Sequence, residues 1–273
     1  LEAKSYHTVS VPLTQDANPL SGLFLGSYLY EFDAENQAWD PLGTPTNTQL
    51  YADKGYLIYY PASNITYSFS GPMNNGAFDA ATMSATSGDH QLVPNPYPSA
   101  IDWDAGSGWT KTNLYDAIWI WSASAGNYAS YINQTGTNGG TQYIPVGQAF
   151  FVQANTSGNP ALSMNNDVRV HNDQAFFKSR EDGDNLLRIE ANTSHYSDEI
   201  IIHFHKDATN NFDGQYDVGK LYGLGDSPQL YSYSDDNYKL SINSIPPVVE
   251  DRTIQLGFEL SVPETVSLEF SSM

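Results

Sequence analysis

Residues 92–103 read LVPNPYPSAIDW, and this stretch is the strongest indication of the fold of the chain. Its three prolines lack a backbone N–H group and fix their own φ angles, and each favours an extended residue before it. These constraints exclude a helix and predict a rigid loop without a repeating backbone. We expect the loop to pack against a sheet, with the side chains of Asn95 and Asp102 bonding backbone groups that the prolines leave unpaired.

Short segments rich in β-branched and aromatic residues lie on both sides of this loop. They include residues 5–12, 26–33, 49–61 and 116–132. Residue types of this kind favour strands, and the segments are separated by turn residues. Their spacing is typical of an all-β sandwich or barrel.

The composition changes along the chain. Residues 1–165 contain 3 basic and 12 acidic residues, whereas residues 166–273 contain 8 and 19. The stretch TSGNPALSMNND before this change is rich in residues typical of linkers, so we place a domain boundary near residue 165. Beyond it, apolar residues alternate as in half-buried antiparallel strands. The sequence therefore predicts two antiparallel β-sandwich domains in tandem, of jelly-roll or immunoglobulin-like type, at residues 1–165 and 166–273.

The chain is strongly acidic, with a formal net charge of −20 and no cysteine in 273 residues. This charge argues against nucleic acid and anionic membrane surfaces as partners, because both are bound through basic patches. The absence of cysteine excludes disulfide bonds and thiolate chemistry. No apolar stretch is long enough for a transmembrane helix, so we expect no membrane insertion.

One loop gathers oxygen-bearing side chains, the residue types that hold calcium. The candidate metal ligands in this loop are Asp207, Asn210, Asn211, Asp213 and Asp217. The spacing is not that of an EF-hand, and calcium is the only cofactor that this pattern suggests. The alternative is a loop whose side chains face water and cap backbone donors, because Asp and Asn are common in any loop.

Tryptophans offer a second candidate site, for carbohydrate. Trp119 and Trp121 share one face of a predicted strand, because side chains alternate along a strand, and Trp109 lies nearby in the sequence. Exposed indoles could form a flat platform on which sugar rings stack. The competing interpretation is a strand that is buried on both faces.

Motifs of common catalytic sites are absent. The sequence contains no G-x-S-x-G nucleophile elbow, no H-E-x-x-H metal motif and no Walker lysine loop. A hydrolase would have to bring two carboxylates together by folding, which the sequence alone does not forbid. We therefore predict no enzymatic activity and name no catalytic residue.

Eight segments follow one another along the chain: GYLIYY, NPYPSAIDWD, IPVGQAFFVQA, LRIEA, DEIIIHFHKDATNNFDGQYDVGKL, PQLYSY, LSIN and TIQLGFEL. Together they resemble a β-rich region found near the C-terminus of secreted and surface proteins of Bacteroidetes, ahead of the sorting domain read by the type IX secretion system. The resemblance covers most of the chain. It implies an extracellular or cell-surface location and neighbouring domains of the same larger polypeptide as partners. It also implies further strands after residue 273, so that the second sandwich would be truncated and would leave an unpaired edge.

Two hypotheses about function follow. The first is a non-catalytic secreted or cell-surface module, acting as a stalk, adhesion or cargo-associated β domain of a larger type IX-secreted protein. The alternative is a carbohydrate-binding module attached to a polysaccharide-degrading enzyme. The partners would be other surface protein chains in the first case and glycans in the second.

Overall fold

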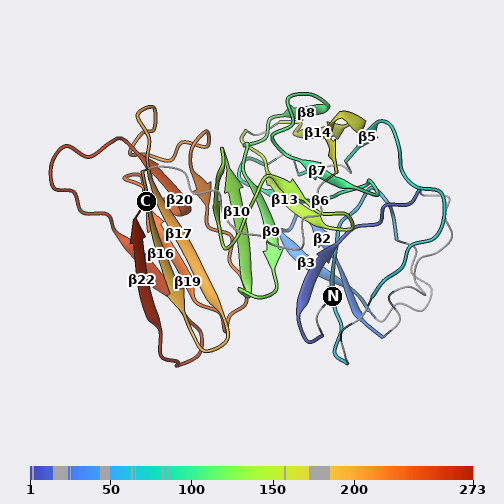
Figure 1. The fold of residues 1–273 in the computed structure, drawn as a ribbon, viewed down its shortest axis with the longest axis horizontal. Coiled ribbons are helices and arrows are strands. Elements are labelled where there is room, and N and C mark those ends of the chain that lie inside the picture. Colours follow the sequence, from blue (N-terminus) through green and yellow to red (C-terminus); the bar gives the residue numbers. More distant parts are fainter. Residues whose placement is uncertain are drawn as a thin grey trace. The chain divides into compact units, whose positions relative to one another are not determined.

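The chain is all-β, as the sequence predicted (Figure 1). The computed structural model describes residues 1, 3–14, 24, 26–43, 50–62, 64, 66–80, 83–84, 86–156, 158–171 and 185–272. Strands joined by turns and loops account for the architecture, and η2 (Asn166–Val168) is a single turn of 3-10 helix.

The chain divides into two compact units. The first contains the described residues of 1–115 and 142–176, and the second contains those of 116–141 and 177–273. Segment 116–141 is therefore grouped with the second unit, although it precedes the predicted boundary near residue 165. Because this division does not show whether either unit folds alone, tandem domains at 1–165 and 166–273 remain a prediction.

The first unit contains short antiparallel strands. They are β1 (Tyr6–Val9), β2 (Tyr28–Asp33), β3 (Ala38–Gly43), β4 (Tyr56–Tyr59), β5 (Phe78–Asp79), β6 (His90–Pro94), β7 (Ala100–Asp102), β8 (Trp109–Thr112), β12 (Tyr143–Ile144), β13 (Ala149–Gln153), β14 (Ala161–Met164) and β15 (Arg169–Val170). Within this unit the hydrogen-bonded orders are β1-β4-β2-β3, β13-β6, β12-β7-β15 and β5-β14-β8. The described residues thus form several small sheets.

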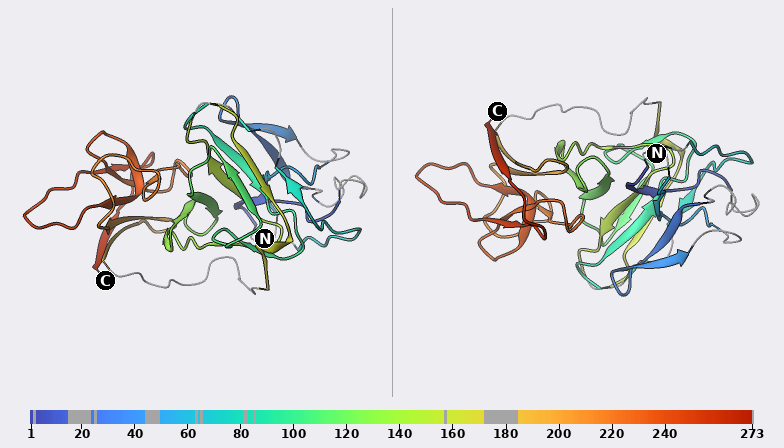
Figure 2. Two further views of the ribbon diagram at one scale, coloured as in Figure 1. Left: turned by 90° about the horizontal axis from the view of Figure 1, so that it is seen from above. Right: turned by 90° about the horizontal axis from the view of Figure 1, so that it is seen from below.

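Two of these layers pack face to face, as in a sandwich (Figure 2). The ring of Phe32 on β2 lies 4.8 Å from the ring of Phe151 on β13, in edge-to-face contact. Gly55, just before β4, lies so close to the other layer that an added Cβ atom would be 2.7 Å from atoms of Leu92 and Ala149. Only glycine fits there, and its substitution would push the layers apart.

The proline segment is interior scaffolding, as expected, but part of it is regular. Its first residues end β6 and its later residues form β7, so the irregular part is shorter than the sequence predicted. Buried Asn95 joins these strands to their surroundings. Its Nδ2 atom donates to the carbonyl oxygens of Ser99, Ile144 and Pro145 at 2.9–3.2 Å, and its Oδ1 atom accepts from the N–H group of Tyr97 at 3.0 Å. The predicted role of Asn95 is confirmed.

The second unit contains three paired strands in the order β11-β10-β9 and one larger sheet. Its strands are β9 (Ile118–Ser122), β10 (Asn127–Ile132), β11 (Thr135–Thr137), β16 (Leu186–Asn192), β17 (Ser197–Phe204), β18 (Val218–Gly219), β19 (Gln229–Tyr233), β20 (Lys239–Ile245), β21 (Leu256–Glu259) and β22 (Ser267–Ser272). The larger sheet has the order β21-β19-β20-β17-β16-β22, with β18 also paired to β20. The pair β17–β20 is parallel, which departs from the purely antiparallel prediction.

Buried charges tie the two sheets of this unit together. The carboxylate of Asp198 on β17 forms an ion pair with Lys220, and both side chains are almost fully buried. It also accepts hydrogen bonds from the Asn138 side chain and from the N–H group of Leu230. Arg188 on β16 bonds the carboxylate of Glu199 and the carbonyl oxygen of Gly136. Buried charges of this kind are tolerated because each has a partner.

Candidate functional site

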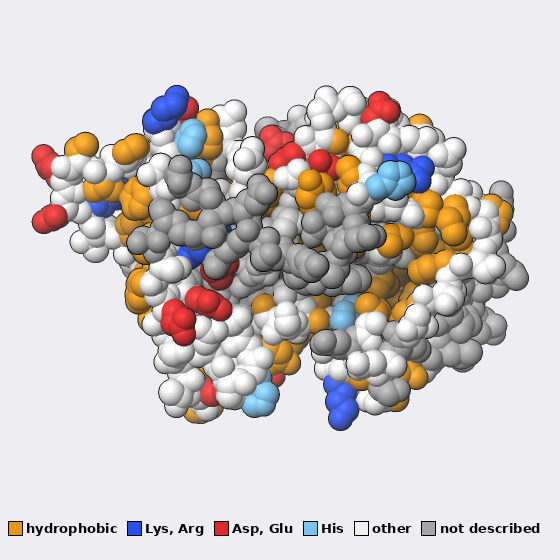
Figure 3. All heavy atoms as spheres, in the orientation of Figure 1, with side chains coloured by type: hydrophobic (Ala, Val, Ile, Leu, Met, Phe, Trp, Pro, Cys, Tyr) orange, Lys and Arg blue, Asp and Glu red, His pale blue; other side chains and the backbone are white. Residues whose placement is uncertain are grey.

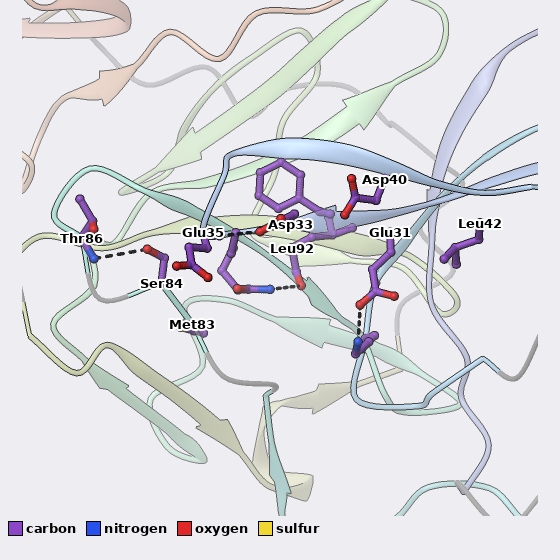
Figure 4. A pocket seen from close by; sticks show the side chains of 14 residues that line it. Glu31, Asp33, Glu35, Asp40, Leu42, Met83, Ser84, Thr86 and Leu92 are labelled. Carbon is purple, nitrogen blue, oxygen red and sulfur yellow. Dashed lines mark hydrogen bonds and ion pairs between the residues drawn. The ribbon is translucent and has the colours of Figure 1, made fainter.

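An open pocket of about 680 Å³ lies on the first unit, between the β2–β3 hairpin and a wall that includes Met83, Ser84, Thr86, Gln91 and Leu92 (Figure 4). The hairpin contributes four carboxylates, from Glu31, Asp33, Glu35 and Asp40. Apolar side chains, among them Phe32, Leu42, Met83 and Leu92, form the rest of the wall together with Ser84, Thr86 and Gln91. The pocket thus offers hydrogen-bond acceptors beside an apolar surface.

The local sequence explains why the carboxylates gather here. Alternation along β2 places Glu31 and Asp33 on one face of the strand and Phe32 on the other. The carboxylate of Asp33 then accepts hydrogen bonds from the N–H groups of Glu35 and Asn36, which closes the turn of the hairpin. A further bond from the Asn36 side chain, at 2.7 Å, lowers the pKa of Asp33. The turn therefore keeps its negative charge.

Only one of the four carboxylates has a cationic partner in the described part of the chain. Glu31 forms an ion pair with Lys54, and both side chains are about one-third exposed. Glu35 and Asp40 form no ion pair with any described residue, so their oxygens are available to a ligand. The lining carries four acidic groups and one lysine, which leaves it negatively charged.

The arrangement of the carboxylates limits the chemistry of the pocket. Figure 4 shows all four along one hairpin, whereas Met83, Ser84 and Thr86 come from another segment. Glycoside hydrolysis needs two carboxylates that flank the scissile bond. A set confined to one wall suits binding of hydroxyl or cationic groups better than catalysis. The lack of a catalytic residue remains a prediction.

The predicted tryptophan platform is corrected by the structure. Trp119 and Trp121 are only 0% and 6% exposed, and every residue of β9 is buried. The indole N–H group of Trp119 donates to the carbonyl oxygen of Gly219 at 3.0 Å, so it is used inside the second unit. The strand is buried on both faces, which was the competing interpretation.

Trp109 belongs to the first unit instead. It is half-buried on β8, its N–H group donates to the carbonyl oxygen of Asp102 at 2.8 Å, and its ring meets Trp103 edge-to-face. The three tryptophans therefore present no joint exposed surface. Carbohydrate binding through them stays a prediction without geometric support.

Four of the five predicted calcium ligands, Asp207, Asn210, Asp213 and Asp217, bond groups within the chain through their side chains. Asp207 pairs with Lys206 at 2.8 Å, and the Oδ1 atom of Asn210 accepts from Arg252. Asn211 is exposed. No group of three or more His, Cys, Asp or Glu side chains with metal-binding geometry occurs among the described residues. The loop resembles the alternative interpretation, in which its polar side chains cap backbone groups, and calcium binding stays a prediction.

Asp217 is the buried member of this loop. Its carboxylate accepts from the N–H groups of Asp213 and Ser244, both at 2.7 Å. Desolvation by burial is the main cause that raises the pKa of Asp217 to about 7, and the two backbone hydrogen bonds oppose it. The side chain fastens the loop to β20, a role that its position in a polar loop did not reveal.

The chain belongs to a family that is described as a domain of unknown function (DUF8693), whose model matches residues 1–273. No curated protein and no solved structure matches the chain. Within the part of the chain that the structure describes, no helix is long and apolar enough to cross a membrane.

Proposed function

We propose that this chain is a non-catalytic module of a larger secreted or cell-surface bacterial protein, and that it works by binding another polypeptide. Such a module would serve as a stalk, adhesion or cargo-associated β domain. The extracellular location and the type IX route rest on the resemblance of its segments to the Bacteroidetes region. Its partners would be neighbouring domains or other surface chains.

The observation that best supports this proposal is the exposure of large apolar side chains on the second unit (Figure 3). The exposed residues on both edge strands and the loop before β21 are Val248, Val249, Leu256, Phe258, Leu268 and Phe270. Single exposed apolar residues are ordinary, but larger apolar patches mark sites of interaction. Each edge strand therefore offers a partner polypeptide two exposed apolar side chains, Leu256 and Phe258 on β21 and Leu268 and Phe270 on β22.

Site-specific cross-linking tests this proposal in the producing cells. Phe270 is replaced by the photoreactive residue benzoylphenylalanine in the full-length protein, and Tyr238, which is also exposed, is replaced in a control. We expect a high-mass adduct with another polypeptide from position 270 and none from position 238. Protease treatment of intact cells must also degrade the protein, because a surface module is accessible. No adduct from position 270 contradicts polypeptide binding.

The acidic pocket favours a second candidate function, the binding of carbohydrate. Sugar hydroxyl groups donate hydrogen bonds to carboxylates, and the apolar faces of sugar rings pack on apolar lining side chains such as Leu42. Glu35 and Asp40 have the accessible oxygens for this role. The site differs from the predicted tryptophan platform, although the ligand class is the same.

A glycan array separates this candidate from the first. The double variant Glu35→Gln, Asp40→Asn should weaken binding of any glycan by roughly tenfold or more, because hydrogen bonds to charged groups are lost. The variant Glu250→Gln, Asp251→Asn removes two exposed carboxylates outside the pocket and should leave binding unchanged. If no glycan binds the unmodified chain, the second candidate is eliminated and the first is unaffected.

A further inference from the structure

The apolar face of the larger sheet extends past its buried cluster to both edges. Ile189 and Leu230 belong to the buried cluster. Phe270 on β22 lies directly opposite Ile189, and Phe258 on β21 lies directly opposite Leu230. Directly opposite residues of an antiparallel pair point to the same face. Both aromatic side chains therefore continue the core face, yet they are 62% and 43% exposed.

The β22 strand lies at the edge of the sheet, and its apolar and polar residues alternate as in a strand that is covered on one face. Leu268 and Phe270 point to the apolar face, and Glu269 points to the other. Among the described strands β22 pairs with β16 alone, so no described strand bonds the backbone N–H and C=O groups of its outer edge. An added strand would satisfy these groups and cover the two apolar side chains at once.

Charge distinguishes β22 from the opposite edge. On β21, Glu259 accepts hydrogen bonds from Lys239 at 2.9 Å and from Tyr231 at 2.8 Å, and the bond from Lys239 is the main cause that lowers the pKa of Glu259 to about 2. The carboxylate on the β21 edge is therefore already paired with a lysine of the same chain. On β22, Glu269 is exposed, forms no ion pair with a described residue and lies directly opposite Glu190. A cation on an added strand, directly opposite Glu269, would form a favourable cross-strand charge pair.

We propose that β22 is a docking edge for an extended strand of another polypeptide in which apolar and basic residues alternate. The apolar residues of that strand lie opposite Leu268 and Phe270, and a lysine or arginine lies opposite Glu269. The proposal rests on the proposed function of polypeptide binding and adds the form and the chemistry of the partner.

A designed peptide tests this with the full 273-residue chain. The probe is a capped, fluorescent eight-residue peptide that alternates valine and lysine, and its match replaces every lysine with glutamate. Fluorescence anisotropy should show binding of the lysine peptide and clearly weaker binding of the glutamate peptide. Hydrogen exchange should slow at the backbone of residues 267–272 when the lysine peptide is bound. Equal affinity for the two peptides, or no binding of either, overturns the proposal.

Matched variants locate the peptide. Phe270→Ser should abolish most binding, whereas Phe258→Ser, the equivalent change on the other edge, should leave the affinity within about twofold, since that strand does not pair with the peptide. Glu269→Lys should weaken binding of the lysine peptide by about fivefold, because a favourable cross-strand charge pair becomes a repulsive one. This exposed substitution also keeps the test decisive if Phe270→Ser fails to fold. Equal losses for the two serine variants contradict docking at β22.

Two further measurements separate the partner from other outcomes. Analytical ultracentrifugation of the chain alone should show a monomer. A dimer that Phe270→Ser dissociates would mean that a second copy of this chain pairs with β22, which contradicts a basic strand of another polypeptide as the partner. If position 270 still forms adducts in cells while the peptide does not bind, the proposed function stands and this inference falls. If the peptide binds with the expected charge dependence and no adduct forms, the inference stands and the cellular role falls.

Discussion

Replacing Asn95 with alanine should destabilise the first unit by about 3–5 kcal/mol. The substitution leaves the buried N–H group of Tyr97 without its acceptor, which costs about 1–3 kcal/mol. It also removes the two side-chain protons that the carbonyl oxygens of Ser99, Ile144 and Pro145 share, at roughly 1 kcal/mol for each lost proton. For a unit of this size we expect the melting temperature to fall by about 10 °C.

Urea denaturation followed by circular dichroism measures this loss, with Asn159→Ala as the control. Asn159 lies in the same unit, is exposed and has no side-chain hydrogen bond in the described structure, so its loss should be within about 0.5 kcal/mol. Asn95→Asp is a sharper variant, because it keeps the acceptor for Tyr97 but faces the carbonyl oxygens with a carboxylate. A loss below about 1 kcal/mol for Asn95→Ala, or a tolerated aspartate, would refute the role of this side chain as the clamp of the proline segment.

Four further predictions concern the second unit. Trp119→Phe should cost about 1 kcal/mol more than Trp121→Phe by denaturation, because only the first indole N–H group has a hydrogen-bond acceptor. Lys220→Met should cost about 3–5 kcal/mol, since it leaves the buried carboxylate of Asp198 without its cation; a neutral result contradicts the ion pair. The pKa of Asp217 in the folded state, about 7, is above its unfolded value, so protonation of this carboxyl stabilises the fold. This contribution to the free energy of unfolding is complete below about pH 4 and is lost as the pH rises through about 7. Asp217→Asn should therefore remove a pH dependence of the free energy of unfolding of at most about 1.4 kcal/mol per pH unit. Calcium or a chelator should change the melting temperature by less than about 1 °C, because the carboxylates of that loop are bonded inside the chain, and a calcium-dependent rise would restore the predicted metal site.

The all-β fold could be predicted from the sequence because its signals are local. Prolines at alternate positions exclude a helix wherever they occur, and aromatic and β-branched runs favour strands before any tertiary contact forms. The role of Asn95 was predictable for the same reason. An asparagine among prolines is surrounded by backbone groups that its side chain can reach within a few residues, and Tyr97 and Ser99 are two of its partners.

The burial of the tryptophans could not be predicted, because alternation assigns residues to two faces without showing whether both are covered. Ile118 and Trp119 point to opposite faces of β9 and both are fully buried. The acceptor of the Trp119 N–H group, Gly219, lies 100 residues away in the chain. No pattern within the IWIW stretch contains that information. The outcome depends on the packing of β9 against distant segments.

The acidic pocket was missed for a related reason. Four acidic residues between positions 31 and 40 are visible in the sequence, but a hairpin turn is a common place for them. They become a pocket only because Met83 and Leu92, more than forty positions later, lie beside the hairpin and add an apolar wall. The acidic run was the available signal, and its meaning depended on packing between segments far apart in the chain.

The two candidate surfaces differ in how much of their chemistry is already satisfied inside the chain, and this difference ranks them. In the pocket, Asp33 accepts a hydrogen bond that closes its own turn and Glu31 forms an ion pair with Lys54. Two of the four carboxylates therefore already have partners within the chain. At β22, no described strand pairs with the outer backbone edge, and the side chains of Leu268 and Phe270 are 50% and 62% exposed. Uncovered apolar area and unpaired backbone groups both carry a free-energy cost that a bound strand removes together. For this reason the edge strand, rather than the pocket, is where we expect the chain to make its main contact.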